Sequence, residues 1–212
     1  MRVLKRHTYA GLALFAVAAL GLTACTAEAT PADPTPASSA EVETDFTANL
    51  VGSACAAYAD AVPDGGGSIA GMAIDPVATA ASNNPLLTTL AAAVSGGLNS
   101  AVNLVDTLNG SEFTVFAPVD DAFAALPAET VAALSDPANA DLLSSILTYH
   151  VLPGQILPSD LAGEYTTVQG STLNVTGSGD SLMINDATVL CGGVVTANAT
   201  VYLVDTVLSL PE

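Results

Sequence analysis

The sequence predicts an α+β fold in which helices come first along the chain and strands follow. Helical apolar spacing and helix-capping residues fill the part before His150. Short extended runs separated by glycine, asparagine and aspartate fill the part after it. The core-forming stretch, which begins at Asp45, has the length of one domain. Helices and strands that are segregated in this way are typical of an α+β arrangement.

The chain opens with a basic start, an apolar run and small residues before a cysteine, which indicates a signal peptide over residues 1–24. The ending Leu-Thr-Ala-Cys resembles the bacterial lipobox, so we expect acylation of Cys25 after cleavage. Cleavage nearby without acylation is the alternative. The apolar run of about 13 residues is shorter than the roughly 20 that span a bilayer. We therefore expect an extracytoplasmic protein, lipid-anchored at the cell membrane and surface, with shedding as a further option.

Two segments are expected between the signal peptide and the main domain. Residues 25–44 are rich in Ala, Thr, Pro, Ser and acids and lack apolar periodicity, which is typical of a disordered spacer. Residues 45–74 are expected to form a helical N-terminal extension that ends near the Pro-Asp-Gly-Gly-Gly-Ser stretch. One helical face of this extension would carry Phe46, Leu50, Val51, Ala54 and Tyr58.

Turn and cap residues predict the next helices. Asp75 is expected to be an N-cap with Pro76 at the first helical position, and the Asn84-Pro85 pair repeats this device ahead of the following helix. Gly96 then ends that helix. Two extended runs flank Asn109-Gly110, which predicts a hairpin.

The remaining elements follow from similar signals. Asp120 is expected to cap a short helix that contains Phe123. A further helix should end just before His150 and face the core through Leu142, Leu143, Ile146 and Leu147. Beyond it, a meander of antiparallel strands is expected.

Cysteine usage predicts one disulfide. With Cys25 acylated, Cys55 and Cys191 remain, an even number in an oxidising compartment. Two independent buried thiols are the alternative. Two distant thiols and one histidine have no zinc-binding spacing, and no calcium-binding loop pattern occurs among the acids. We therefore expect no metal and no other cofactor.

The distribution of charge excludes several functions. All three Lys and Arg residues lie in the predicted signal peptide, and all 21 Asp and Glu residues lie beyond it. Nucleic-acid binding depends on Lys and Arg at phosphates, as does the usual nucleotide site. A Schiff-base lysine is also impossible in the mature chain. Because basic residues that attract anionic lipids are lacking, membrane attachment must depend on acyl chains. We also expect the protein to be a monomer.

No arrangement of residues predicts an enzyme. Ser144, Ser145 and Asp141 lie near His150 in sequence, but their spacing does not bring a nucleophile beside it, and no Gly-x-Ser-x-Gly elbow occurs. Asp120-Asp121 is explained better by helix capping than by a pair of glycosidase carboxylates. We therefore expect a non-enzymatic protein.

Three blocks of the sequence resemble the fasciclin domain. They are "FTVFAPVDDAF" at residues 113–123, "ILTYHVLPG" at 146–154 and "VYLVDTVLSLP" at 201–211. The wider stretch 52–211 is similar to secreted and lipidated mycobacterial members of that family. The resemblance implies a fasciclin domain over residues 75–210, a seven-stranded antiparallel β wedge with helices packed around it. It also implies that a disulfide between Cys55 and Cys191 ties the N-terminal extension to the domain.

The resemblance has two departures. Val119 stands where many members have threonine, which leaves Asp120 as the expected cap in the first block. Tyr202 stands where many members have histidine, a feature that the mycobacterial group shares.

The resemblance also points to a candidate interaction motif. Tyr149 and His150 belong to the second block, and in animal fasciclin domains this region is implicated in adhesion. The alternative, which we favour, is that His150 satisfies backbone groups where the chain crosses from helix to strand. The expected function is recognition of an envelope or host-surface macromolecule by a lipid-anchored protein. A carrier of a small apolar or lipid ligand and a purely structural envelope component are the alternatives.

Overall fold

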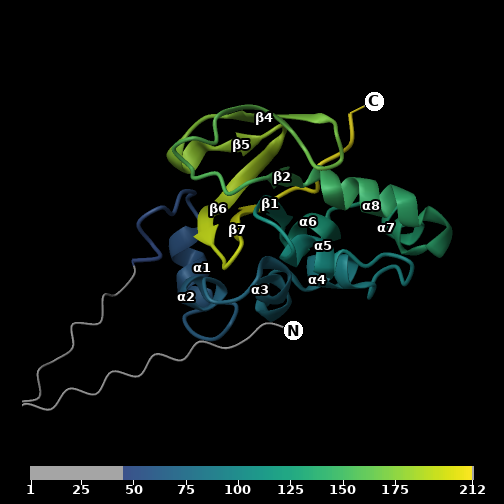
Figure 1. Ribbon diagram of the computed structural model, residues 1–212, viewed down its shortest axis with the longest axis horizontal. Coiled ribbons are helices and arrows are strands. Elements are labelled where there is room, and N and C mark those ends of the chain that lie inside the picture. The colour runs from purple at the N-terminus through teal and green to yellow at the C-terminus, as the bar shows by residue number, and fades with distance from the viewer. Residues whose placement is uncertain (1–44, 212) are drawn as a thin grey trace, which may run out of the picture. The chain divides into compact units, whose positions relative to one another are not determined.

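The computed structural model describes residues 45–211 (Figure 1). The predicted signal peptide, the acylation of Cys25 and the spacer lie outside these residues. Within the described range, no helix is both long enough and apolar enough to cross a membrane.

The strands form one seven-stranded sheet in the order β2-β1-β7-β6-β5-β4-β3. Its strands are β1 Phe113–Pro118, β2 Val151–Pro153, β3 Gly163–Thr166, β4 Thr172–Thr176, β5 Met183–Ile184, β6 Ala187–Val195 and β7 Ala199–Val204. Every neighbouring pair is antiparallel except β1 and β7, which are parallel. The expectation of a wholly antiparallel sheet was therefore wrong. A short turn from β6 sets the direction of β7, which then enters the sheet beside the much earlier β1.

The helices lie mainly before the strands in sequence, as expected for an α+β fold, but three of them separate β1 from β2. The helices are α1 Cys55–Ala61, α2 Ile69–Met72, α3 Val77–Asn83, α4 Thr88–Ser95, α5 Val105–Asn109, α6 Asp120–Ala124, α7 Ala128–Ser135 and α8 Ala140–Tyr149. Figure 1 shows α1 to α4 gathered at the end of the molecule opposite β4 and β5.

The core has two parts, one on each side of the central strands. One part joins the helices to β1, β6 and β7 and contains Leu87, Val115 and Leu203. The other lies among β4, β5, β7 and the C-terminal residues, and it contains Tyr149 and Tyr202. All residues of β1 and β7 are buried, as expected for strands that are covered on both faces.

Several helix starts are capped by side chains from far away in the sequence, which corrects three local predictions. Asp120 does not cap α6. Its carboxylate accepts hydrogen bonds from the Thr88 and Thr89 N–H groups, at 3.3 and 2.7 Å, at the start of α4. Partial burial acts to raise the pKa of Asp120, but the hydrogen bonds from the two threonines outweigh it and lower that pKa. The predicted N-cap of this helix, Asn84, lies four residues before Thr88 and accepts from Leu86 N–H instead.

The predicted hairpin at Asn109-Gly110 was also wrong, because residues 105–109 form α5. The amide oxygen of Asn109 accepts a hydrogen bond from Ala78 N–H (3.1 Å) at the start of α3. Pro76, not Asp75, is the N-cap of α3, and the side chain of Asn198 accepts from Val77 N–H (2.9 Å). These contacts with α3 override the local preference for strands around Asn109. Gly96, with φ of 85°, ends α4 as predicted.

Two predicted helical faces differ from the structure. Leu142 is 45% exposed, whereas Leu143 and Leu147 are buried. In the N-terminal extension, helix α1 begins only at Cys55, and Val51 forms an isolated bridge with Gly192 of β6. The open edge of β6 pairs with this segment in extended form, because unpaired strand edges readily accept another strand.

Candidate functional site: the C-terminal groove

His150 lies at the C-terminal end of α8 and is only 3% exposed. Its Nε2 accepts a hydrogen bond from Leu208 N–H (2.9 Å), so the proton of the neutral ring is on Nδ1. Nδ1 then donates to the Ile146 carbonyl oxygen (2.7 Å). The ring therefore connects the last turn of α8 to the C-terminal segment.

The environment of His150 keeps it neutral. Burial lowers its pKa to about 4, although the hydrogen bond to Ile146 acts in the opposite direction. Both ring nitrogens already have backbone partners, so neither is free to accept a proton from Ser144 or Ser145. Both contacts are with backbone groups at the crossing from helix to strand, which is the arrangement that the favoured interpretation of His150 expects.

Tyr149 is also buried, and it connects α8 to the opposite end of the sheet. Its hydroxyl donates to the Thr172 carbonyl oxygen at 3.0 Å and accepts from Asn185 Nδ2 at 3.0 Å. Asn185, which has a φ of 51°, also accepts a hydrogen bond from Asn174 N–H (3.0 Å). Tyr149 and Asn185 thus fix the position of β4 relative to the turn between β5 and β6.

These contacts build an open groove of about 720 Å³, which we call the C-terminal groove. Such a volume is within the range of roughly 300–1,000 Å³ that is usual for ligand sites. Strand residues line one side of the groove, and the C-terminal segment lines the other. The hydrogen bond from Leu208 to His150 fixes the position of the C-terminal segment. The lining residues are Tyr149, Glu164, Thr172, Leu173, Asn174, Asn185, Asp186, Ser209, Leu210 and Pro211.

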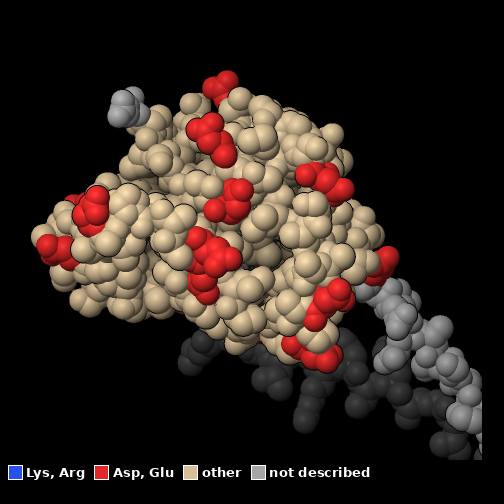
Figure 2. All heavy atoms as spheres, turned by 180° about the vertical axis from the view of Figure 1, so that it is seen from behind, with Lys and Arg blue, Asp and Glu red and all other residues tan. Residues whose placement is uncertain are grey.

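The groove is acidic and has no basic side chain in its lining. Glu164 and Asp186 are exposed carboxylates, and no residue from 45 to 211 is a lysine or arginine that could pair with them. Figure 2 shows acidic side chains spread over one face of the molecule with no basic side chain among them. The sequence reasoning found Tyr149 and His150 but missed Asn174, Asn185 and the C-terminal wall. The Asn185-Asp186 turn between two extended runs was the available signal.

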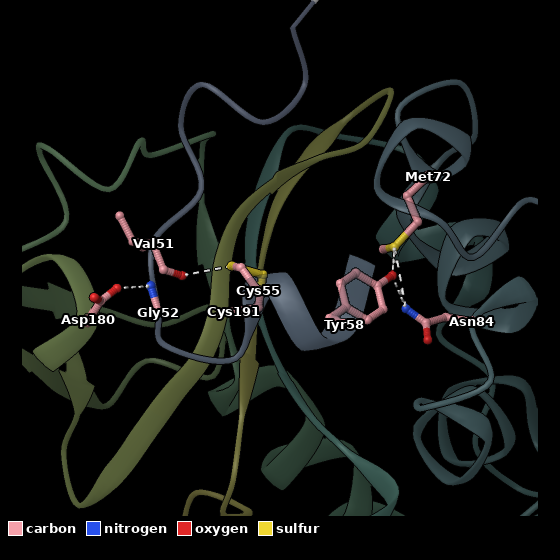
Figure 3. The surroundings of a disulfide bond; sticks show 8 residues. All are labelled: Val51, Gly52, Cys55, Tyr58, Met72, Asn84, Asp180 and Cys191. Atoms are coloured by element: carbon pink, nitrogen blue, oxygen red, sulfur yellow. Dashed lines mark hydrogen bonds between the residues drawn. A yellow bond between two sulfur atoms is a disulfide. The ribbon is translucent and has the colours of Figure 1, made fainter. Parts of the chain in front are cut away.

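The Cys55–Cys191 disulfide is present, so the prediction of a pair is confirmed and the alternative of independent thiols is wrong (Figure 3). It joins residues 136 apart in sequence. Near it, the buried Tyr58 hydroxyl accepts a hydrogen bond from Asn84 Nδ2 (2.8 Å). Burial raises the pKa of Tyr58 to about 12, although the hydrogen bond from Asn84 opposes this shift.

An apolar cavity of about 40 Å³ lies among α3, α4, α5, α8 and β1, with His150 in its lining. This volume is far below the roughly 300 Å³ at which ligand pockets usually begin. Within residues 45–211, no group of three His, Cys, Asp or Glu side chains is arranged to hold a metal ion. The C-terminal groove is therefore the better candidate for a binding site.

The chain combines a buried parallel pair of strands in an otherwise antiparallel sheet with helices at one end and the Tyr149-His150 crossing beside it. The Fasciclin domain model matches residues 85–211. The match covers more than half of the chain, so the protein belongs to the fasciclin family.

Two mycobacterial relatives and one solved structure illustrate the similarity. The chain is 60% identical over 167 residues to cell surface glycolipoprotein MPT83 of Mycobacterium tuberculosis, covering 79% of this chain and 75% of the relative. It is 57% identical over 163 residues to immunogenic protein MPB70 of Mycobacterium bovis, covering 77% and 83%. The fold resembles a FAS1 domain pair from the insect cell adhesion molecule Fasciclin I, with a TM-score of 0.54 and 18% identity. That match covers 66% of this chain and 52% of the insect chain.

Proposed function

We propose that this protein is a non-enzymatic, lipid-anchored module at the cell surface that recognises a macromolecule of the envelope or of a host surface through the C-terminal groove. The observation that carries the proposal is the construction of the groove. Tyr149 and His150 use their polar atoms internally, and their contacts hold both sides of a solvent-open concavity.

Three further observations support the proposal. The relatives named as cell surface glycolipoproteins are 60% identical to this chain. The lipobox-like ending before Cys25 suits attachment through acyl chains. The only histidine between residues 45 and 211 has both nitrogens occupied, so the described residues lack a free imidazole base.

The test is binding of the purified mature chain to envelope glycans and to host-surface proteins. A variant with Glu164→Gln and Asp186→Asn should lose at least tenfold in affinity for the partner that the wild type binds. The matched control carries Glu129→Gln and Asp141→Asn, which neutralise two exposed carboxylates outside the groove. Equal binding by both variants, or no saturable binding by the wild type, would contradict the proposal.

The carrier of a small apolar ligand is the second candidate, and the apolar cavity near His150 is the observation that favours it. Its volume of about 40 Å³ requires its lining to move before a lipid fits. Mass spectrometry of gently extracted protein would detect a bound lipid, and ligand-free protein would remove this candidate. A purely structural envelope component, the third candidate, would leave both tests negative.

A further inference from the structure

Residues 45–61, which we call the strap, reach the central strand of the sheet. β6 is the middle strand of seven, and β5 pairs with it only at Ala187 and Thr188. The strap occupies part of the edge that remains. Val51 N–H donates to the Gly192 carbonyl oxygen (3.0 Å), and Gly192 N–H donates to the Val51 carbonyl oxygen (2.7 Å).

Two more hydrogen bonds hold the backbone of the strap on the N-terminal side of Cys55. Ala54 N–H donates to the Leu190 carbonyl oxygen (3.0 Å), and Gly52 N–H donates to the carboxylate of Asp180 (3.2 Å), as Figure 3 shows for Gly52. The backbone of the strap comes this close to β6 because position 52 is a glycine. A Cβ atom at Gly52, where φ is 108°, would lie 2.4 Å from the Leu190 oxygen.

The disulfide is the strongest connection between the strap and the sheet. Cys191 is fully buried in β6 and is opposite Leu203 of β7. By contrast, α1 has no side-chain cap at its start. An apolar cleft of about 190 Å³ also separates part of α1 from β6 and β7. Without the disulfide, residues 45–61 would be held by these hydrogen bonds and by the packing of Leu50 and the buried Tyr58 against the helical part of the core, none of which is covalent.

We propose that the strap transmits force between the membrane tether and the fold of the anchored protein, and that the disulfide passes tension from the tether into β6 without loading the helices. This inference rests on the proposed function, because the membrane tether would join the fold at Asp45. The strand residues of the groove, such as Asn174, lie between Cys55 and Cys191 in sequence. Tension would therefore run from β6 through β5 to β4, while α1 to α7 stay off this path.

The experiment is single-molecule pulling of the mature chain between a handle before Asp45 and a handle at the exposed Asn174. In the wild type, release of residues 45–54 should lengthen the chain by roughly 36 Å, at about 3.6 Å per residue, before the sheet resists. In the Cys55→Ala, Cys191→Ala variant, residues 55–112 should peel away at lower force. This step should add roughly 200 Å before the sheet breaks.

A second variant, Asp180→Ala, keeps the disulfide and is the control for the strap contacts. It should lower the force of the first release and leave the resistance of the sheet unchanged. If the double alanine variant does not fold, the wild type held under constant force should show the 200 Å step after a phosphine reductant cleaves the bridge.

The inference is wrong if the variant without the disulfide resists with the same force and extension as the wild type. It is also wrong if the helices and the sheet of that variant rupture in one event. The pulling measurement uses no binding partner, so its failure and a failure of the binding panel can be told apart.

Discussion

At the scale of single residues, the polar atoms of His150 are both used inside the fold. Its two ring nitrogens connect Ile146 in the last turn of α8 to Leu208 in the C-terminal segment. Loss of the ring would leave a buried backbone N–H and a buried carbonyl group without partners, and each unpaired group is costly.

We expect His150→Ala to lower the free energy of unfolding by about 1–3 kcal/mol, the usual cost of leaving a buried polar group unpaired. Chemical denaturation measures the change. Leu142→Ala, at a 45% exposed position of the same helix, is the control and should change stability much less. Unchanged stability of the His150 variant together with lost ligand binding would show that His150 acts in recognition.

The buried imidazole also predicts a pH dependence. Its folded pKa of about 4 is below the ordinary value of 6.5, so the unfolded chain binds the proton more readily between these values. Stability is therefore complete above pH 6.5 and falls as the pH decreases toward 4, by up to about 3 kcal/mol in total. Between pH 7 and 5, a His150→Gln variant should show a flatter dependence of unfolding free energy. Parallel curves for the two proteins would contradict the assignment.

At the scale of elements, the helices that build the fold depend on partners that are distant in sequence. Asn198 accepts a hydrogen bond from the N–H of Val77, 121 residues earlier in the chain. Asp120 accepts one from the N–H of Thr89, 31 residues earlier. Sequence reasoning found α3, α4, α6, α8 and the end of α4 at Gly96, because these follow from local periodicity and backbone conformation, but it missed α5 and α7. It assigned the caps to neighbouring residues, because local patterns carry no information on contacts between distant segments.

The capping role of Asp120 is testable. We expect Asp120→Ala to cost about 1 kcal/mol, within the usual range of 0.5–2 for a lost N-cap, and to increase hydrogen exchange at the first amides of α4. Asp121→Ala removes the neighbouring, exposed carboxylate and is the matched control. Faster exchange in α6 rather than α4 would restore the original sequence prediction.

At the scale of the whole molecule, the disulfide and the order of the strands decide how the chain is held together. The pairing of Cys55 with Cys191 could be predicted from cysteine number and compartment. The C-terminal groove could not, because it needs Tyr149, Asn185 and the C-terminal segment to meet, and their meeting depends on the complete sheet.

Removal of the disulfide should reduce the stability of the entire domain. The chain-entropy model gives an upper limit of roughly 5 kcal/mol for a loop of this length. Denaturation of the Cys55→Ala, Cys191→Ala variant beside the wild type measures it, and peptide mapping without reductant should recover the two cysteines as one linked pair. Free thiols at both positions would contradict the pairing.

The position of β7 has a consequence for the order of assembly. This strand is the last in the chain, yet it lies between β1 and β6 and hydrogen-bonds to both. Until residues 199–204 have emerged from the ribosome or the export channel, no strand pairs the β2-β1 half of the sheet with the β6-β5-β4-β3 half. A chain interrupted shortly before its final strand would leave the facing edges of β1 and β6 unpaired, and it should be a substrate for quality-control proteases.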